Sequence, residues 1–190
     1  MSFDDTKKKY LLALGKPDNS KKGGVDELAW PLINTINKHP DLYTTSSCSG
    51  RTSLLREAAS GRKDEAHWYF VSHEECSVKE IISSIKIAQG TVWFKFEGAI
   101  FHVVARNEEI ANQFLQMARE AGFKHSGLLA TKKRYIIEIF DAERLEVPIV
   151  IDDQLIVPET FIEYLVREAN KKLLVTHERI LRLKEKIKEK

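Results

Sequence analysis

The sequence has only two cysteines, Cys48 and Cys76, and no long apolar run. No stretch approaches the roughly 20 apolar residues that cross a bilayer, and the first residues lack the apolar segment of a secretory signal. Neither cysteine belongs to a CxxC pair, so in a reducing compartment we expect two free thiols. These absences argue against a membrane-spanning or secreted protein, and we expect a cytoplasmic one.

The sequence also lacks a segment with the composition of an interdomain linker, and it lacks the glycine-rich motifs that bind nucleotides. The 190 residues include five prolines and no Gly/Ser-rich segment, so we expect one domain over residues 1–190. Neither GxGxxG nor a Walker-type lysine loop is present, which argues against the common dinucleotide and phosphate cradles. The two cysteines and six histidines are scattered, so we expect no metal site.

Positive charge is clustered rather than large. The formal net charge of +2 does not by itself indicate a polyanionic partner. Basic clusters at helix ends or in loops can reach phosphates. A solvated surface accounts for any one of them, and the four together are compatible with a nucleic-acid partner. The clusters are Lys7, Lys8 and Lys9; Lys21 and Lys22; Arg62 and Lys63; and Lys132, Lys133 and Arg134.

The periodicity of apolar residues predicts an α+β fold. We expect an antiparallel or mixed β-sheet of roughly seven or eight strands flanked by helices, because the βαβα rhythm of a Rossmann-type fold is missing. A long C-terminal helix begins near residue 158, and we expect its charged end, at about 178–190, to project as an extended helical tail or to fray. The other helices are predicted over 3–14, 25–37, 78–88 and 108–121, and the strands over 42–46, 51–56, 68–73, 91–97, 100–106, 127–131, 135–141 and 145–151.

Turn signals give more local predictions. A loop over residues 47–50 predicts a hairpin between the strands on either side, and Gly98-Ala99 is a two-residue hairpin signal. Pro31 lies inside a helical pattern, where a proline either kinks the helix or marks its first turn. In the second case the helix begins near Ala29. Asp26 is then a candidate N-cap.

The stretch from Thr44 to Arg51, T-T-S-S-C-S-G-R, is polar or small throughout, whereas a half-buried strand should alternate. A Ser-rich turn accounts for its composition. Its backbone N–H groups, small side chains and Arg51 would also suit a carboxylate, a phosphate or a nucleobase edge. A nucleophilic pair of Cys48 and His73 is an alternative, as is a small buried thiol at a strand end.

Two further strands carry polar groups. Lys95 and Glu97 lie beside Trp93 on one strand face, either as a surface ion pair or as part of a site. His102 is placed among apolar neighbours by the same alternation. His73 ends an aromatic strand, where a single histidine is more often structural than catalytic.

Taken together, these motifs resemble the wybutosine-synthesising protein 3 family. The matching segments are T-T-S-S-C-S-G-R at 44–51, V-S-H at 71–73, K-F-E at 95–97, H-V at 102–103, G-F-K-H-S-G at 122–127 and L-E-V-P at 145–148, with K-G-G-V-D at 22–26, Tyr164 and Ala169-Asn170. Gly98-Ala99 departs from the family's Pro-Phe, and Lys124-His125 departs from its Arg-Asn. Since Lys lacks the planar fork of Arg, these departures bear on substrate preference.

The resemblance implies an S-adenosylmethionine-dependent methyltransferase acting on tRNA-Phe. The family methylates N4 of the 7-aminocarboxypropyl-demethylwyosine base at position 37, in the anticodon loop. A stand-alone chain of this length fits an archaeal or simple eukaryotic member. The alternative is a non-catalytic tRNA-binding module that retains the fold, and the oligomeric state is not predicted.

A site assembled from several strand ends follows from the resemblance and the chemistry. Glu97 and His73 are the candidate bases, because a proton must leave the ring nitrogen. Whether the segment from Ser46 to Arg51 holds the methyl donor or the modified base stays open. The candidate cofactor- or substrate-binding residues are Ser46, Ser47, Cys48, Ser49, Gly50, Arg51, Lys95, His102, Ser126, Gly127 and Glu146, and the candidate tRNA contacts are Lys7, Lys8, Lys21, Lys22, Lys132, Lys133 and Arg134.

Overall fold

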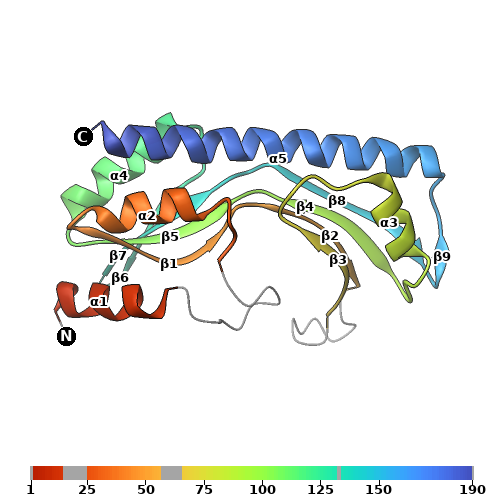
Figure 1. The fold of residues 1–190 in the computed structure, drawn as a ribbon, viewed down its shortest axis with the longest axis horizontal. Helices are drawn as coiled ribbons and strands as arrows, with labels where there is room; N and C mark the ends of the chain where they lie inside the picture. Colours follow the sequence, from red (N-terminus) through yellow and green to blue (C-terminus); the bar gives the residue numbers. More distant parts are fainter. Residues whose placement is uncertain (1, 15–24, 57–65, 132–133, 190) are drawn as a thin grey trace. The chain divides into compact units, whose positions relative to one another are not determined.

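The computed structural model describes residues 2–14, 25–56, 66–131 and 134–189. Within these ranges there are five helices and nine strands, and every strand pairing is antiparallel (Figure 1). The α+β prediction is confirmed, and the fold is not of the Rossmann type. The strands form two sheets, and the chain divides into two compact units. Unit 1 is Met1–Ser49, Ala99–Ala142 and Thr176–Lys190, and unit 2 is Gly50–Gly98 and Glu143–Val175.

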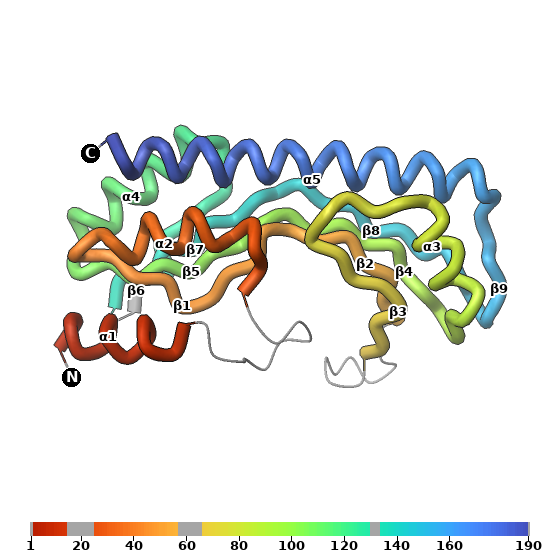
Figure 2. Tube along the Cα trace, viewed as in Figure 1, coloured from red at the N-terminus to blue at the C-terminus, as the bar shows by residue number. Residues whose placement is uncertain are grey.

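Unit 1 contains a four-stranded sheet in the order β1-β5-β7-β6. Helices α2, α4 and the last part of α5 cover one face, and α1 lies on the other (Figure 2). Phe3 and Tyr10 of α1 pack on Tyr43, with ring centroids 5.2 and 5.3 Å apart. The elements are α1 (Phe3–Ala13), α2 (Trp30–Lys38), β1 (Leu42–Cys48), β5 (Ile100–Ala105), α4 (Glu108–Glu120), β6 (Gly127–Thr131), β7 (Arg134–Phe140) and α5 (Glu159–Lys188).

Unit 2 contains a five-stranded sheet in the order β3-β2-β4-β8-β9. Helix α3 and the first part of α5 cover one face and bury Phe94 and Phe96 completely (Figure 1). Burying each of these rings stabilises the fold by about 1.5–3 kcal/mol. The elements are β2 (Arg51–Arg56), β3 (His67–Ser72), α3 (Val78–Ile85), β4 (Val92–Glu97), β8 (Arg144–Ile151) and β9 (Gln154–Leu155).

Both predicted hairpins are wrong. Strands β1 and β2 belong to different sheets, and so do β4 and β5. At the second junction, Gly98 N–H donates to Glu143 O in unit 2, and Asp141 N–H donates to Ala99 O in unit 1, both at 2.9 Å. A short polar or glycine-containing connection therefore marks the point where the chain passes from one sheet to the next.

The start of α2 is predicted correctly, but its cap is not. The helix begins at Trp30 after Ala29, with Pro31 in the first turn, where no N–H is needed. Ala29, at the cap position, makes no side-chain cap hydrogen bond. Instead, the buried Asp26 carboxylate accepts a hydrogen bond from Ser49 N–H at 2.9 Å. The tertiary structure decides the partner of Asp26, because the path of β1 brings Ser49 to a residue that lies 23 positions earlier in the sequence.

Helix α5 is attached by buried polar contacts in each unit. In unit 2, Asn170 Nδ2 donates to Cys76 O at 2.9 Å, and Cys76 N–H donates to Asn170 Oδ1 at 3.0 Å. In unit 1, the fully buried Asp141 carboxylate accepts from Thr176 Oγ1 at 2.7 Å and from Arg179 Nη1 at 2.5 Å. The prediction that the charged end of α5 projects or frays is wrong, because Ile180, Leu183 and Ile187 belong to the core of unit 1.

No helix in the described part of the chain combines the length and apolarity needed to cross a membrane.

Candidate functional site

The predicted site residues fall in both units and form local clusters within each. Unit 2 contains Gly50, Arg51, His73, Lys95, Glu97 and Glu146, and unit 1 contains Ser46, Ser47, Cys48, Ser49, His102, Ser126 and Gly127.

In unit 2, the polar residues lie on the face of the five-stranded sheet opposite the core, which we call the outer face. The alternation along β4 buries Val92, Phe94 and Phe96 and directs Trp93, Lys95 and Glu97 the other way. Across the strands, Arg51 of β2 is paired with Glu97, and Glu146 of β8 is paired with Lys95. Residues directly opposite each other in a sheet share a face, so the register gathers these four charged groups.

The charged groups form two cross-strand ion pairs. Arg51 Nε and Nη2 both lie 2.8 Å from Glu97 Oε2, and Lys95 Nζ lies 2.7 Å from Glu146 Oε1. Glu146 also accepts from Arg144. The hydrogen bond from Lys95, followed by that from Arg144, lowers the pKa of Glu146 below its usual value. We call Arg51, Lys95, Glu97 and Glu146 the charged row.

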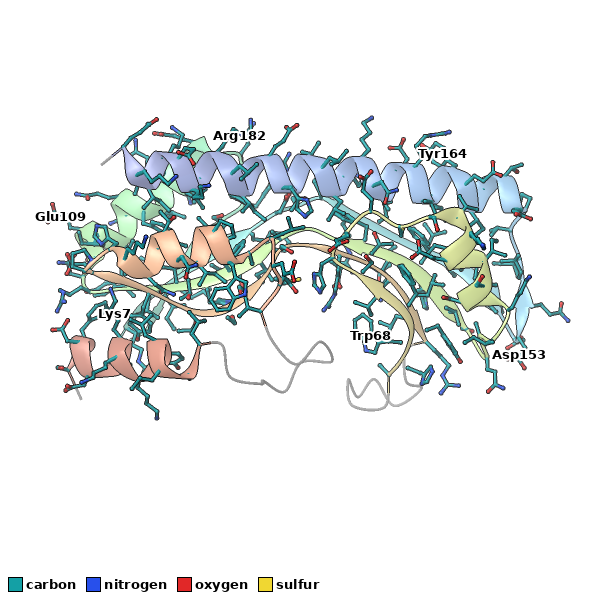
Figure 3. All side chains as sticks on the ribbon, in the orientation of Figure 1. Lys7, Trp68, Glu109, Asp153, Tyr164 and Arg182 are labelled. Carbon is teal, nitrogen blue, oxygen red and sulfur yellow. The ribbon has the colours of Figure 1, made fainter. Side chains whose placement is uncertain are left out.

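Two indole rings accompany the charged row. The Arg51 guanidinium carbon is 4.8 Å from the centroid of Trp68, and Lys95 Nζ is 5.7 Å from that of Trp93. Figure 3 shows Trp68 on the side of β3 that points away from α5. These cation–π contacts hold both rings beside ionic groups. The outer face therefore offers flat aromatic surface and both signs of charge.

His73 follows β3 and belongs to the same unit. Its Nδ1 lies 2.8 Å from the carbonyl oxygen of Gly50. Because a carbonyl can only accept, Nδ1 carries the hydrogen, and Nε2 is the basic nitrogen of the neutral ring. Gly50 has φ of +95°, a conformation that other residues rarely adopt, so a glycine is needed to present this carbonyl.

In unit 1, the register aligns Ser46, His102, Glu138 and Gly127 across β1, β5, β7 and β6. Ser46 Oγ and His102 Nδ1 are 2.7 Å apart, and His102 Nε2 and Glu138 Oε2 are 3.1 Å apart. The prediction that His102 has apolar neighbours is wrong, since it lies in a polar chain. Glu138 carried no signal in the sequence, because it alternates like any other strand residue. An ionised Glu138 directs Nε2–H toward itself, and Ser46 can then donate to Nδ1.

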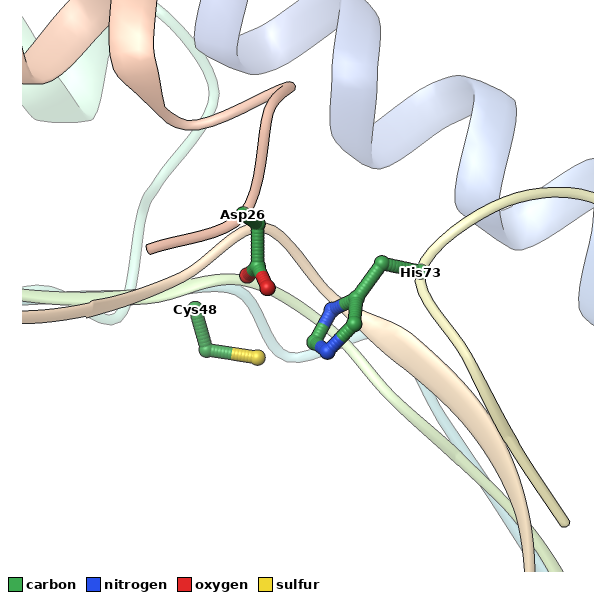
Figure 4. A group of neighbouring side chains, drawn as sticks. All are labelled: Asp26, Cys48 and His73. Atoms are coloured by element: carbon green, nitrogen blue, oxygen red, sulfur yellow. The ribbon is translucent and has the colours of Figure 1, made fainter. Parts of the chain in front are cut away.

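Asp26 is a polar residue of unit 1 that sequence reasoning assigned only to helix capping. Its carboxylate is buried and holds Ser49 through the backbone N–H and through Oγ at 3.3 Å. Figure 4 shows the side chains of Asp26 and Cys48, together with His73 of unit 2. The available signal was the position of Asp26 at the end of K-G-G-V-D, one of the segments that carry the family resemblance.

Ser126 directly precedes β6, and Gly127 is the first residue of that strand. Ser126 is buried, its Oγ accepts from Phe140 N–H at 3.1 Å, and its carbonyl accepts from Arg119 Nη2 at 3.1 Å. These bonds fasten the beginning of β6 to its own unit. A Cβ added to Gly127 would meet open space, so packing within the described structure does not require the glycine.

The candidate tRNA contacts are only partly described. Lys7 is half-buried, its ammonium donates to the carbonyl oxygens of His39 and Pro40, and burial lowers its pKa. Lys7 therefore helps to attach α1, whereas Lys8 and Arg134 are exposed. Lys21, Lys22, Lys132 and Lys133 lie outside the described residues.

Both cysteines are free, as predicted. Burial raises the pKa of the Cys76 thiol to about 11. In a Cys48→Ser variant we expect the remaining thiol to react with a disulfide reagent at pH 8 at least about tenfold more slowly than in the urea-unfolded chain, because the reactive species is the thiolate. Equal rates in the two states, measured by absorbance, would contradict this, and a Cys76→Ala variant provides the matched control.

A comparison with protein families matches residues 5–189 to the model described as methyltransferase TYW3. A Thermococcus sibiricus protein named tRNA(Phe) 7-((3-amino-3-carboxypropyl)-4-demethylwyosine(37)-N(4))-methyltransferase is 36% identical over 98% of this chain and 94% of its own length. A Xenopus laevis protein named tRNA wybutosine-synthesizing protein 3 homolog is also 36% identical, over 88% of this chain and 68% of its own.

The fold is similar to that of a solved protein from Pyrococcus horikoshii. The TM-score is 0.90 with 34% sequence identity, covering 98% of this chain and 96% of the solved one.

Proposed function

Because the chain belongs to the TYW3 methyltransferase family, we propose that it is an S-adenosylmethionine-dependent tRNA methyltransferase. Its reaction is the transfer of a methyl group to N4 of 7-aminocarboxypropyl-demethylwyosine at position 37 of tRNA-Phe. The observation that carries this proposal is the 36% identity, over 98% of the chain, to the Thermococcus protein named for that activity. Nothing in the described structure favours the alternative of a non-catalytic tRNA-binding module.

The outer face of unit 2 has the chemistry that these reactants require. S-adenosylmethionine supplies the methyl group as part of a sulfonium and carries an amino-acid group and a flat base. Arg51 and Lys95 offer cations, Glu97 and Glu146 offer carboxylates, and the charged row lies beside the rings of Trp68 and Trp93. Holding reactants in alignment is the main contribution that a protein makes to such a transfer.

Glu97 and His73 are the proposed bases for the proton that leaves N4. Glu97 uses Oε2 to hold Arg51, and its Oε1 has no hydrogen-bond partner among the described residues. The Gly50 carbonyl fixes the His73 tautomer with Nε2 as the basic nitrogen. A carboxylate or an imidazole within hydrogen-bond reach of the reacting nitrogen can accept the proton, so each residue has the required chemistry.

Unit 1 is proposed to contribute substrate contacts. The Ser46–His102–Glu138 chain offers a hydroxyl whose orientation is fixed, and Ser47, Cys48 and Ser49 adjoin it on β1 and at its end. The hydrogen bond from Phe140 N–H holds Ser126 in place at the start of β6. The next residue, Gly127, is paired with Glu138 and is a small residue beside this polar chain.

The tRNA is proposed to bind through its anticodon loop. Trp93 and Trp68 can stack on an unpaired or enlarged base, and Lys8 and Arg134 can contact phosphates. As part of the same proposal, the two free cysteines fit a reducing compartment such as the cytoplasm.

Incubation with labelled S-adenosylmethionine and tRNA-Phe carrying the 7-aminocarboxypropyl-demethyl base tests the proposal. We expect label on the base at position 37 and none on tRNA that lacks the tricyclic base. Salt-sensitive tRNA binding without labelled base, and without heat of binding for S-adenosylmethionine in calorimetry, would instead identify a non-catalytic module.

A further inference from the structure

Ser53 is a buried hydroxyl that the predicted site does not use. It lies in the middle of β2, directly opposite Lys95 of β4, and is therefore on the outer face. The residue has no exposed surface, and its Oγ has no hydrogen-bond partner among the described residues. Leaving a buried hydroxyl unpaired costs free energy, and native structures seldom do so without a reason.

The surroundings of Ser53 are strongly charged. Lys95 is itself only 8% exposed and pairs with Glu146 on β8. Arg51 and Glu97 are paired two residues further along the same strands, a displacement of about 7 Å in a sheet. Charges of both signs thus lie opposite Ser53, on β4 and β8, and two residues away along β2 and β4.

We propose that Ser53, Lys95 and Glu146, with Arg51 and Glu97 beside them, form a subsite for an α-amino acid group. The ligand carboxylate accepts from the Ser53 hydroxyl and from the neighbouring cations, and its ammonium donates to Glu146 and Glu97. A phosphate would meet the two carboxylates of Glu97 and Glu146 here, and an uncharged ligand would use neither the cations nor the carboxylates of the two ion pairs. A zwitterion satisfies both signs and supplies the partner that Ser53 lacks.

This inference rests on the proposed function, in which two reactants carry an α-amino acid group. One is the methionine part of the methyl donor, and the other is the aminocarboxypropyl side chain of the base. Both present the same carboxylate and ammonium, so an experiment has to distinguish the two sources.

Ser53→Ala is the informative substitution because it separates binding from stability. It removes an unpaired buried hydroxyl, so a purely structural role predicts an unchanged or higher melting temperature and unchanged binding. The subsite predicts an unchanged or higher melting temperature together with weaker binding. Thr52→Val is the matched control, since it removes a buried hydroxyl from the adjacent position of β2, on the opposite face.

Calorimetry on the full chain uses S-adenosylhomocysteine, which has the amino-acid group, and 5′-methylthioadenosine, which lacks it. The same variants are tested with tRNA-Phe carrying demethylwyosine with and without the aminocarboxypropyl group. If the subsite takes the methyl donor, Ser53→Ala weakens S-adenosylhomocysteine at least fivefold and leaves methylthioadenosine unchanged. If the subsite takes the side chain of the base, the ratio of the affinity for tRNA with the aminocarboxypropyl group to that for tRNA without it falls at least fivefold in Ser53→Ala.

If Ser53→Ala binds all four probes as the unchanged protein does, or if Thr52→Val loses as much affinity, the subsite is wrong while the proposed function stands. If the unchanged protein binds neither S-adenosylhomocysteine nor either tRNA, both the proposed function and the subsite are overturned.

Discussion

Arg51→Ala is expected to lower the turnover of base methylation at least about tenfold, a loss of ~1.4 kcal/mol or more in transition-state stabilisation. Arg51 is the fixed cation that closes the T-T-S-S-C-S-G-R segment, and it links Glu97 to the ring of Trp68. The substitution removes the cation that orients Glu97 and that is proposed to bind an anionic group of a reactant. Glu97→Gln should lower turnover by a similar factor because it removes the proposed base. Initial rates with saturating tRNA measure both effects.

Stability should barely change in either variant, which separates function from folding. The Arg51 and Glu97 side chains are 32% and 43% exposed, and exposed ion pairs contribute about 0–1 kcal/mol. For a chain of this size we expect the melting temperature to stay within about 4 °C. A fully active Arg51→Ala or Glu97→Gln would remove the role assigned to that residue. A variant that fails to fold would show that the pair is structural, and Arg51→Lys tests whether charge alone suffices.

Asp141→Ala is expected to lower the free energy of unfolding by about 3–5 kcal/mol, because it removes a buried carboxylate that holds both the Thr176 hydroxyl and the Arg179 guanidinium. The Asp141 side chain has no exposure, and it accepts from both Thr176 and Arg179. Loss of the carboxylate removes one buried polar attachment of α5 in unit 1. Urea unfolding followed by circular dichroism measures the change.

Asp4→Ala is the matched control for Asp141, since Asp4 also pairs with an arginine, Arg106, but its side chain is 70% exposed. We expect little change in the unfolding midpoint from this variant. A loss from Asp141→Ala no larger than the loss from Asp4→Ala would show that the buried cluster does not stabilise the unit.

The helices were the most predictable part of the fold. Each has apolar residues at helical spacing, and α3 and α4 also begin at side chains that cap their own first turns, Ser77 and Asn107. These signals are local, because a helix closes its hydrogen bonds within four residues. The strands were located almost as well, because alternation is equally local.

Strand pairing was the part that local signals misjudged. The segment at 47–50 and Gly98-Ala99 look like hairpin turns, yet each connects strands of different sheets. Ladder hydrogen bonds are made by the backbone, which is the same at every residue, so neither turn specifies its partner strand. The partner of β1 is β5, more than fifty residues away.

The sequence by itself determined the α+β class, the positions of the elements and, through separated motifs such as V-S-H and L-E-V-P, the family. Only the tertiary structure decided which polar residues meet. It placed Asp26 against Ser49, Glu138 against His102, and Ser53 opposite Lys95. The physical reason is that each of these contacts depends on strand register or on a long-range approach of the chain. A shift of one residue would direct the same side chains to the opposite face.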